Sequence, residues 1–451
     1  MKGTAYHTKE DVLRRAQEII GIPLKEVDKF GRLSTGKGAI GSVIEESWYG
    51  YSPNSESEPD FPEAGVELKV TPYIKRKGEI TAKERLVCNI INYMEEYDCT
   101  FKTSSFWHKC QRMLLMSYEH LYDKPKGEYR IDKAILFEFP VEDLKIIEHD
   151  WEMIMQKVRG GRAHEISEGD TLYLAACTKG ATSASVRKQP FSDIPAKQRA
   201  YSLKQSYMTQ ILRRYIFGKE ENERIIKDWH VLVNHTFIDV IKERVAPYIG
   251  RTRTELLKEF SISGRAKNSN ELIFAAMLGI RGHVSQAEEF VKADVCPKVV
   301  KLNMDGSITE NISFPAFDFI KISKETTWED SQLYGMLAPK KFLFVLFQEI
   351  EGKEQVFYGI RTWNMPEPDL EEVRRVWQKT IKTIKRGVVL RPTASRTYNN
   401  LPKQRESRVA HVRPHGRDSR DMAPLPDGRM MTKQCFWLNR AYVAEQIKGL
   451  L

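Results

Sequence analysis

The sequence predicts an α/β protein that contains two tandem copies of one fold, and three observations support this prediction. The chain has 451 residues, which suggests two domains rather than one. Apolar stretches with the length and composition of strands occur together with segments that have an apolar helical face. Residues of the same type also recur in the same order in the two halves of the chain.

The strands and helices are placed by their periodicity. The segment 66–70 is predicted to be a strand with one apolar face, 172–176 a strand that leads into a turn, and 342–347 a buried strand. The segments around Trp151 and Trp377 are predicted to be helices with one apolar face. Both element types therefore occur in each half of the chain.

A shift of about 229 positions aligns the two halves. Gly21 then falls on Gly250 and Gly50 falls on Gly279. The later pairs keep their order at similar shifts, which indicates a duplicated fold rather than chance matches. The further pairs are Glu26 with Glu255, Val27 with Leu256, Lys29 with Lys258, Phe61 with Phe290, Ala64 with Ala293, Val66 with Val295, Lys69 with Lys298, Trp151 with Trp377, Gly161 with Gly387 and Tyr207 with Tyr442.

The boundary between the copies is set by a change in composition. The first copy ends near the polar stretch 218–223, and the second begins around Val240. We therefore predict domains at 1–225 and 243–451, with 226–242 as the linker.

Composition narrows the class of protein. The net charge of +10 favours a polyanionic partner, although ribosomal and membrane-surface proteins are also basic. The six cysteines include no C-x-x-C pair, so we expect free thiols and neither a zinc ribbon nor a redox pair. The apolar run 342–347 is too short to cross a bilayer, and the first residues contain no apolar signal core. These features predict a soluble cytoplasmic protein without a membrane partner.

The segment 59–70, P-D-F-P-E-A-G-V-E-L-K-V, contains the residues that indicate an activity. Because alternate side chains of a strand share a face, Glu67 and Lys69 point the same way. Asp60, at the end of the preceding turn, can reach the same point. Two carboxylates and an amine at a strand end form a hard-oxygen site for a divalent cation, with a lysine placed to manage charge or protons. Such a site is suited to metal-assisted hydrolysis of a phosphodiester.

An acid-x-Lys triplet is not specific by itself, because a solvated strand edge can contain one. The triplets at 143–145 and 351–353 have no companion carboxylates in a comparable strand. In contrast, the strand at 66–70 is apolar on its other face. The segment 41–50 is predicted to be a short helix that ends at a glycine, and it brings Glu46 to the site as a third carboxylate.

The pattern formed by Glu46, Asp60, Glu67 and Lys69 resembles the MutH mismatch-repair endonucleases of the PD-(D/E)xK nuclease superfamily. Over nearly the whole chain, the sequence is similar to the Sau-type type II restriction endonucleases, which cut at GATC. Lys109 matches a lysine near the active site of the MutH family, although its surroundings alone predict only a solvated helix face. The likeness continues in order through 84–93, 103–106, 150–152, 174–181, 196–203, 411–415 and 431–434.

This resemblance implies two restriction-endonuclease-like domains, each with a mixed central sheet flanked by helices. It implies a bacterial restriction–modification enzyme that makes Mg²⁺-dependent double-strand cuts in duplex DNA at GATC, 5′ of the G. It also suggests a second DNA site in the C-terminal domain and a dimer on DNA.

The resemblance further implies roles for single residues. Asp60 and Glu67 would hold the metal, with help from the Leu68 carbonyl. Glu46 would position a second metal or a water molecule. Lys69 would orient or deprotonate the attacking water and stabilise the charge of the transition state.

The second copy lacks this set of residues. At the shift of about 229, the four site positions correspond to Ala275, Glu289, Cys296 and Lys298. A site that has lost two of three oxygen ligands should not hold a catalytic Mg²⁺. We therefore predict a C-terminal domain that does not cleave. The resemblance implies that it binds DNA and acts allosterically, whereas the alternative is a copy retained only to pack against the first.

Several basic residues are candidates for DNA contacts. Lys179 follows a predicted strand, and the resemblance makes it a base-reading or phosphate contact. Arg199 and Lys204 lie in a basic, aromatic stretch that suits phosphate contacts, although a solvated loop fits each of them nearly as well. Arg413 and His415 lie in an arginine-rich segment of the second copy. Because arginine reads guanine edges well, we predict a DNA-reading loop there.

Two other functions are considered beside the restriction enzyme. A strand-nicking repair endonuclease is disfavoured because the repair enzymes resemble only the first copy. A DNA-binding regulator with a vestigial nuclease site is disfavoured because the four residues of the first copy are intact.

Overall fold

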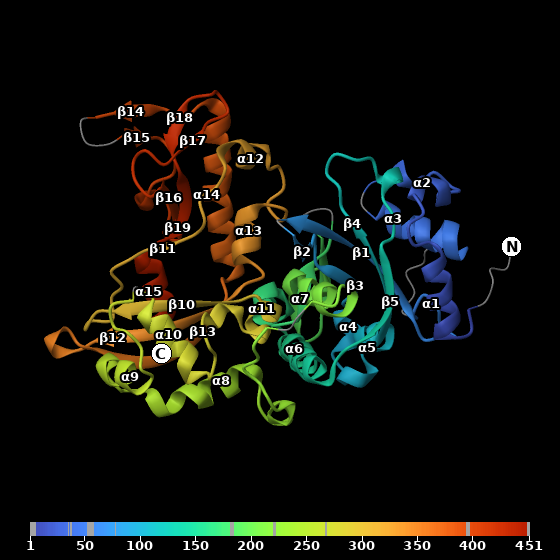
Figure 1. The fold of residues 1–451 in the computed structure, drawn as a ribbon, viewed down its shortest axis with the longest axis horizontal. Coiled ribbons are helices and arrows are strands. Elements are labelled where there is room, and N and C mark those ends of the chain that lie inside the picture. Colours follow the sequence, from blue (N-terminus) through green and yellow to red (C-terminus); the bar gives the residue numbers. More distant parts are fainter. Residues whose placement is uncertain are drawn as a thin grey trace. The chain divides into compact units, whose positions relative to one another are not determined.

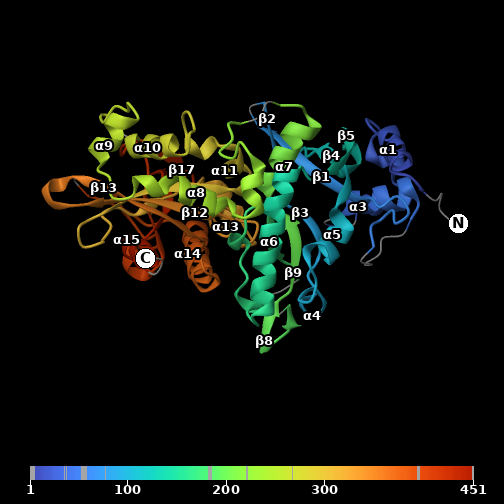
Figure 2. The same ribbon diagram turned by 90° about the horizontal axis from the view of Figure 1, so that it is seen from below.

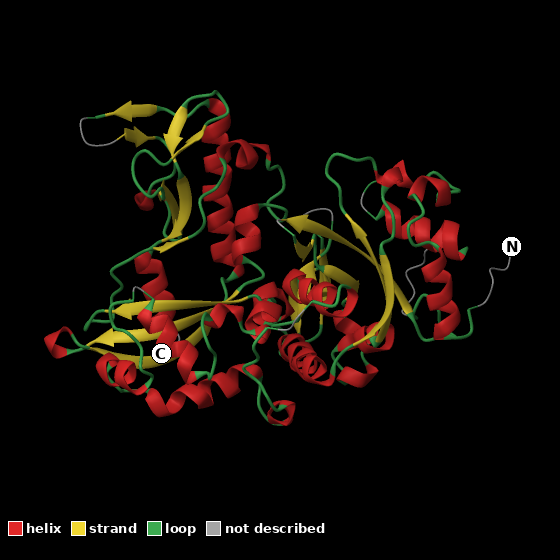
Figure 3. Cartoon of the chain, in the orientation of Figure 1, coloured by secondary structure: helices red, strands yellow, loops and turns green. Residues whose placement is uncertain are grey.

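The computed structural model describes residues 6–34, 36, 38–51, 58–76, 78–180, 185–219, 222–266, 268–393 and 397–448. The chain forms two compact units. The first unit consists of Met1–Phe237 with Gln286–Asp294, and the second of Ile238–Ser285 with Val295–Leu451. Each unit combines sheets and helices, so the predicted α/β class is confirmed (Figures 1 and 3).

The division between the units differs in one respect from the predicted domains. The chain passes from one unit to the other after Phe237, which lies inside the predicted linker 226–242. Gln286–Asp294, however, packs within the first unit, although its sequence position is in the predicted C-terminal domain. The reason is a set of buried ion pairs and backbone hydrogen bonds that this segment makes with the first unit.

The first unit is built on the sheet that carries Glu67 and Lys69. This sheet has the order β2-β1-β4-β5, in which β1 and β4 are parallel and the other neighbours are antiparallel. A second sheet, β3-β9-β6, is antiparallel, and β7 and β8 form a hairpin. The strands are β1 Glu67–Arg76, β2 Glu79–Ala82, β3 Leu86–Ile90, β4 Arg112–Glu119, β5 Lys133–Glu138, β6 Leu174–Thr178, β7 Val186–Gln189, β8 Ser192–Lys197 and β9 Arg199–Leu203.

Helices cover these sheets. Apolar residues of α1, α2, α3 and the π-helical segment η2 pack with β1 and β4 in one core (Figure 1). The helix α6 buries Trp151 and lies along the β3-β9-β6 sheet (Figure 2). The helical elements are α1 Lys9–Glu18, α2 Leu24–Val27, α3 Ala39–Ser42, η2 Val43–Tyr49, α4 Tyr93–Glu96, α5 Ser105–Cys110, α6 Val141–Arg159, α7 Gln205–Ile211, η7 Leu212–Ile216 and α11 Glu288–Ala293.

The second unit repeats the order of the strands β1, β4 and β5 and has no counterpart of β2 in its described sheet. In the sheet β10-β12-β13, β10 is parallel to β12 and β12 is antiparallel to β13, as for β1, β4 and β5. The antiparallel sheet β11-β19-β16 matches β3-β9-β6. The strands are β10 Val295–Leu302, β11 Ile312–Ser313, β12 Lys341–Glu349, β13 Gln355–Trp363, β14 Leu390–Pro392, β15 Thr397–Asn399, β16 Ala410–Pro414, β17 Met422–Pro424, β18 Met430–Thr432 and β19 Gln434–Leu438.

The helices of the second unit follow the same scheme. The long helix α14 comes after the main sheet, as α6 does in the first unit, and it buries Trp377 in the unit's core. The predicted helix around this tryptophan and the predicted strand 342–347, which is β12, are confirmed. The helices are α8 Phe237–Val245, α9 Arg253–Glu259, α10 Ser269–Met277, α12 Phe319–Lys324, α13 Gln332–Leu337, α14 Glu367–Arg386 and α15 Arg440–Lys448.

Details of the backbone recur where the sequence repeat places them. Gly21 and Gly250 have φ of 81° and 84°, and Gly50 and Gly279 have φ of 79° and 72°. Glycine adopts this left-handed conformation without the steric cost of a Cβ, which explains why glycine stands at both members of each pair. The same correspondence holds for the isolated bridges Pro23–Arg130 and Thr252–Val356, and for the hydrogen bonds Tyr207–Asp143 and Tyr442–Asp369.

Two predictions from composition can be compared with this fold. All six cysteines are free, as predicted. Among the described helices, none combines the length and the apolar character that are needed to cross a membrane.

Candidate active site

Glu67 and Lys69 lie beside each other at the start of β1, as the two-residue period of a strand predicts. Lys69 Nζ donates a hydrogen bond to Glu67 Oε1 over 2.6 Å, and Glu67 is only 1% exposed. The opposite face of the chain carries Val66 and Leu68, which are buried in the apolar core. The strand therefore holds a charged pair on one face while its other face is fixed by packing.

Asp60 is held against the same strand by two hydrogen bonds, each between a backbone N–H and a carboxylate oxygen. The Asp60 N–H donates to Glu67 Oε2 over 3.2 Å, and the Leu68 N–H donates to Asp60 Oδ2 over 3.0 Å. The turn between them passes through Gly65, whose φ of 61° suits glycine. The structure thus brings the two predicted carboxylates together.

Lys109 completes the charged group from another element. It lies near the end of α5, and its Nζ is 3.7 Å from Glu67 Oε1. Burial raises the pKa of Glu67 to about 7; the Asp60 charge adds to this rise, and Lys69 and Lys109 oppose it. Burial opposes the charge on Lys69, but the Glu67 carboxylate outweighs it and the pKa of Lys69 lies above its ordinary value. Lys69 is therefore a stable ammonium group in this state.

The third predicted carboxylate, Glu46, is engaged elsewhere. Its two oxygens accept hydrogen bonds from Arg32 Nε and Nη2 over 2.5 and 2.9 Å. The neighbouring Glu45 interacts electrostatically with the site. Burial and the charge of Asp60 raise the pKa of Glu45, and Lys69 opposes this rise. Both glutamates lie in the π-helical segment η2, whose wider turn changes the direction of each side chain relative to an α-helix. Sequence spacing contains no signal that separates the two.

The oxygen ligands fit a magnesium ion. Within the described part of the chain, no group of three or more His, Cys, Asp or Glu side chains is arranged to hold a metal. Asp60 and Glu67 supply two carboxylates, however, and Mg²⁺ is usually held by one or two carboxylates together with water and substrate phosphate. Burial, and to a lesser extent the charge of Asp60, raise the pKa of Glu67, and a bound cation would favour the ionised form of both carboxylates.

Two of the predicted DNA contacts in the first unit are directed into the protein. Arg199 is 2% exposed and donates to the Ala176 carbonyl over 2.7 Å. Lys204 is 4% exposed and donates to the Thr171 carbonyl over 2.6 Å. Their predicted role in DNA binding does not fit this burial, and both instead tie backbone segments together. Lys179 is exposed just after β6, where its side chain can meet a phosphate.

Asp150, which lies in the segment 150–152 that resembles the MutH-related enzymes, has a role in the fold rather than in the site. It is buried on α6 and accepts three backbone N–H groups at the start of β6. It therefore fixes this helix to the β3-β9-β6 sheet. The three donors are Leu172, Tyr173 and Leu174.

In the second unit, the predicted DNA-reading residues flank an aromatic ring. Arg413 is exposed on β16, and its guanidinium lies 5.0 Å from the centre of the Trp437 ring. The His415 ring meets the same tryptophan edge-on, with ring centres 5.4 Å apart. Trp437 belongs to β19 and was not singled out from the sequence. Its neighbours Phe436 and Leu438 are buried. Because successive side chains of a strand point to opposite faces, Trp437 faces outward.

The positions that the predicted repeat aligns with the active site have different surroundings. Glu289 packs in the first unit, where its carboxylate accepts the N–H groups of Ile225 and Ile226 over 2.9 and 2.7 Å. Ala275 is buried and Cys296 is a free thiol, so neither supplies a hard oxygen ligand. Lys298 remains on β10 without the carboxylate that accompanies Lys69.

Two carboxylates and a lysine that meet at the start of a strand, within an α/β domain, define a nuclease site of the metal-assisted class. A family model for the DNA mismatch repair enzyme MutH matches residues 49–150, which include Asp60, Glu67, Lys69 and Lys109. The type II restriction enzyme Sau3AI of Staphylococcus aureus is 38% identical over 490 aligned positions, covering 99% of this chain and 100% of that protein. The protein therefore belongs to the family of Sau3AI-like, MutH-related type II restriction endonucleases.

Mismatch repair relatives match less of the chain. The MutH protein of Shewanella baltica strain OS155 is 29% identical over 217 residues, covering 46% of this chain and 95% of that protein. The MutH protein of Escherichia coli strain SMS-3-5 is 30% identical over 222 residues, covering 46% of this chain and 93% of that protein. Nearly the whole length of a MutH protein thus corresponds to about half of this chain.

Proposed function

We propose that the protein is a Mg²⁺-dependent type II restriction endonuclease that makes double-strand cuts in duplex DNA at GATC, 5′ of the G, in the bacterial cytoplasm. The observation that carries the proposal is the group that Asp60 forms with Glu67 and Lys69 at the start of β1, in a chain similar over its full length to a type II restriction enzyme. The target sequence and the cut position are supported by that similarity alone.

The chain supplies distinct functions at the reacting phosphate. Asp60 and Glu67, together with the Leu68 carbonyl, would hold Mg²⁺, which supplies Lewis acidity and lowers the pKa of water. Lys69, as an ammonium group beside Glu67, orients the attacking water and stabilises negative charge on the phosphate oxygens. Lys109 adds a second positive charge near the same carboxylate. Because its Nζ is 3.7 Å from Glu67 Oε1, Lys109 can also stabilise the negative charge on the phosphate oxygens.

We place Glu45, rather than Glu46, as the third carboxylate of the site. The charge of Asp60 acts on Glu45, whereas Arg32 occupies both oxygens of Glu46. In this arrangement Glu45 positions water, and Glu46 orients the η2 segment through its ion pair.

We further propose that the second unit is a degenerate MutH-like domain that binds DNA, possesses no cleavage site and acts allosterically. The shared strand order, the recurrent positive-φ glycines and the paired Tyr–Asp hydrogen bonds support a common origin. The loss of the carboxylates at Ala275 and Cys296 supports a division between a cutting unit and a binding unit. Arg413, His415 and Trp437 are the proposed DNA-reading group, and a dimer on DNA would present two cutting units to the two strands.

Cleavage assays with matched variants test this function. The purified protein, its Glu67→Ala variant and a Glu10→Ala control, changed at an exposed glutamate of α1, are incubated with GATC-containing and GATC-free plasmids in Mg²⁺ or EDTA. We expect linear products only from GATC plasmids in Mg²⁺, with loss of cleavage in Glu67→Ala alone. Nicked circles without linear product would instead indicate a strand-nicking enzyme, and binding without cleavage a regulator.

The allosteric role has a separate test. Plasmids with one and with two GATC sites are cut by the parent protein and by Arg413→Ala. We expect the two-site plasmid to be cut faster by the parent and this advantage to be lost in the variant. Equal rates on both plasmids with both proteins would remove the allosteric proposal and leave the cleavage function unaffected.

A further inference from the structure

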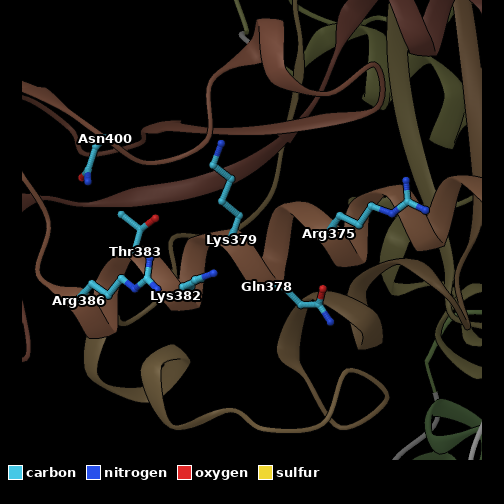
Figure 4. Close-up of a pocket in the computed structure, with 7 residues that line it drawn as sticks. All are labelled: Arg375, Gln378, Lys379, Lys382, Thr383, Arg386 and Asn400. Atoms are coloured by element: carbon cyan, nitrogen blue, oxygen red, sulfur yellow. The ribbon is translucent and has the colours of Figure 1, made fainter.

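A basic pocket lies along α14 in the second unit, apart from the proposed DNA-reading group. It is an open hollow of about 520 Å³ that is lined by polar and positively charged residues. Figure 4 shows the lining side chains along one helix, with Asn400 brought in from the segment after β15. The lining residues are Arg375, Gln378, Lys379, Lys382, Thr383, Arg386 and Asn400.

The cations of this pocket form a single row on the helix. Arg375, Lys379, Lys382 and Arg386 are spaced by four, three and four residues, which places them on one face. The opposite face, with Trp377, Ile381 and other apolar residues, is buried in the core, so the basic face is held toward solvent. No carboxylate lines the pocket among the described residues.

Ordinary helix electrostatics do not explain the whole row. Cations near the C-terminus complement the helix dipole, but this effect is confined to about the last turn. It accounts for Lys385 and Arg386 and not for Arg375 or Lys382, which lie further back. Like charges at these spacings also repel each other, so the row is unfavourable for the isolated helix.

The equivalent helix of the first unit does not have this feature. At the shift of about 226, the positions of Gln378, Lys379 and Lys382 are occupied by acidic, apolar and neutral residues, namely Glu152, Met153 and Gln156. Each cation of α6 also has an ion-pair partner: Lys145 pairs with Glu148, Lys157 with Asp170 and Arg159 with Glu152. In α14, only Lys379 of the four lining cations has an ion pair in the described part of the chain, with Glu406. The basic pocket is therefore particular to the second copy.

We propose that this pocket binds the phosphate groups of duplex DNA and forms a sequence-independent contact of the second unit. This proposal rests on the proposed function, because that function identifies DNA as the anion. The row from Arg375 to Arg386 is about 16 Å long at 1.5 Å per residue. Phosphates of one strand follow each other at about 3.4 Å along the duplex axis, so a linear polyanion matches the row better than a compact ion. The basic and amide groups of the lining residues fit phosphodiester oxygens.

Two variants of the full chain distinguish a specific contribution of the pocket to DNA binding from the effect of net charge. Lys382→Glu changes a lining residue, and Lys385→Glu changes an exposed lysine of the same helix that is outside the lining. Both alter the net charge equally. Binding to a duplex with GATC and to a scrambled duplex is measured without Mg²⁺ over a range of salt concentrations, with thermal unfolding as a check of folding.

We expect Lys382→Glu to weaken binding to both duplexes by the same factor, about tenfold, and to reduce the slope of log K against log salt by about 1. Lys385→Glu should leave the slope unchanged. Equal effects of the two variants, or none from Lys382→Glu, would overturn the proposal. Displacement of DNA by equimolar inorganic triphosphate from the parent but not from Lys382→Glu would also overturn it, in favour of a small-anion site. Cleavage at GATC does not enter this assay, so failure of the proposed enzyme function is seen separately.

Discussion

Replacing Lys292 by methionine removes the positive charge from a buried ion pair of the first unit. The Lys292 Nζ is 2.7 and 2.9 Å from the two oxygens of Asp143 and 2.7 Å from Glu288 Oε1. The side chains of Lys292 and Asp143 are 4% and 2% exposed. Methionine has a similar length without the charge, so the main loss is electrostatic. Glu288 keeps its ion pairs with two arginines, whereas Asp143 keeps only the Tyr207 hydroxyl among the contacts described.

The expected loss follows from the burial of that carboxylate. Removing one partner of a buried ion pair costs about 3–5 kcal/mol, because the remaining charge is desolvated without compensation. Burial already raises the pKa of Asp143, and Lys292 opposes this rise. Without the lysine the pKa rises further, so the folded variant binds a proton that the unfolded chain releases. A folded-state pKa above the unfolded value makes stability fall as pH rises between the two, so the deficit should be larger at pH 8 than at pH 5.

Urea denaturation followed by tryptophan fluorescence measures this free energy at both pH values. Lys133→Met, at an exposed lysine of β5, is the matched control and should change stability by less than about 0.5 kcal/mol. The double variant Lys292→Met with Asp143→Asn removes both charges and should recover part of the loss. A deficit below about 1 kcal/mol that is independent of pH would refute the reasoning, as would a double variant no more stable than Lys292→Met.

Three further predictions concern the site and its support. Glu45→Gln should lower kcat of plasmid cleavage at least about tenfold, while Glu46→Gln should have a smaller effect; the reverse order would restore Glu46 as the third carboxylate. Because the pKa of Glu67 is raised to about 7, a divalent cation must displace its proton at lower pH. Cation affinity measured by calorimetry should therefore fall about tenfold per pH unit below 7 and level off above it, and a flat profile would contradict the raised pKa. Asp150→Ala leaves three buried N–H groups without their acceptor and should destabilise the protein by about 3 kcal/mol or more, while the Mg²⁺ requirement of the residual cleavage stays unchanged.

The sequence was sufficient where local periodicity decides the structure. The two-residue period of a strand placed Glu67 and Lys69 on one face, and their hydrogen bond agrees with this. The apolar helical faces around Trp151 and Trp377 likewise identified α6 and α14. Each of these features depends on residues close together in the chain, so a short segment contains the information.

The sequence was insufficient where partners come from distant segments. Arg199 and Lys204 are basic residues in a polar stretch, but their partners are carbonyl groups of other strands and turns, and burial follows from those contacts. The choice between Glu45 and Glu46 depends on the π-helical turn and on Arg32, fourteen positions earlier than Glu46. Neither arrangement leaves a pattern in the spacing of residues.

The sequence by itself determined the chemical class of the site, and it predicted a duplication in which the first copy retains the carboxylates. These depend on residue identity and on the order of residues along the chain. Only the tertiary structure decided that Gln286–Asp294 packs with the first unit and that the basic row of α14 lines a pocket. Both outcomes depend on which charges find a partner across long distances in sequence, and Coulomb and desolvation energies are fixed by distances in space.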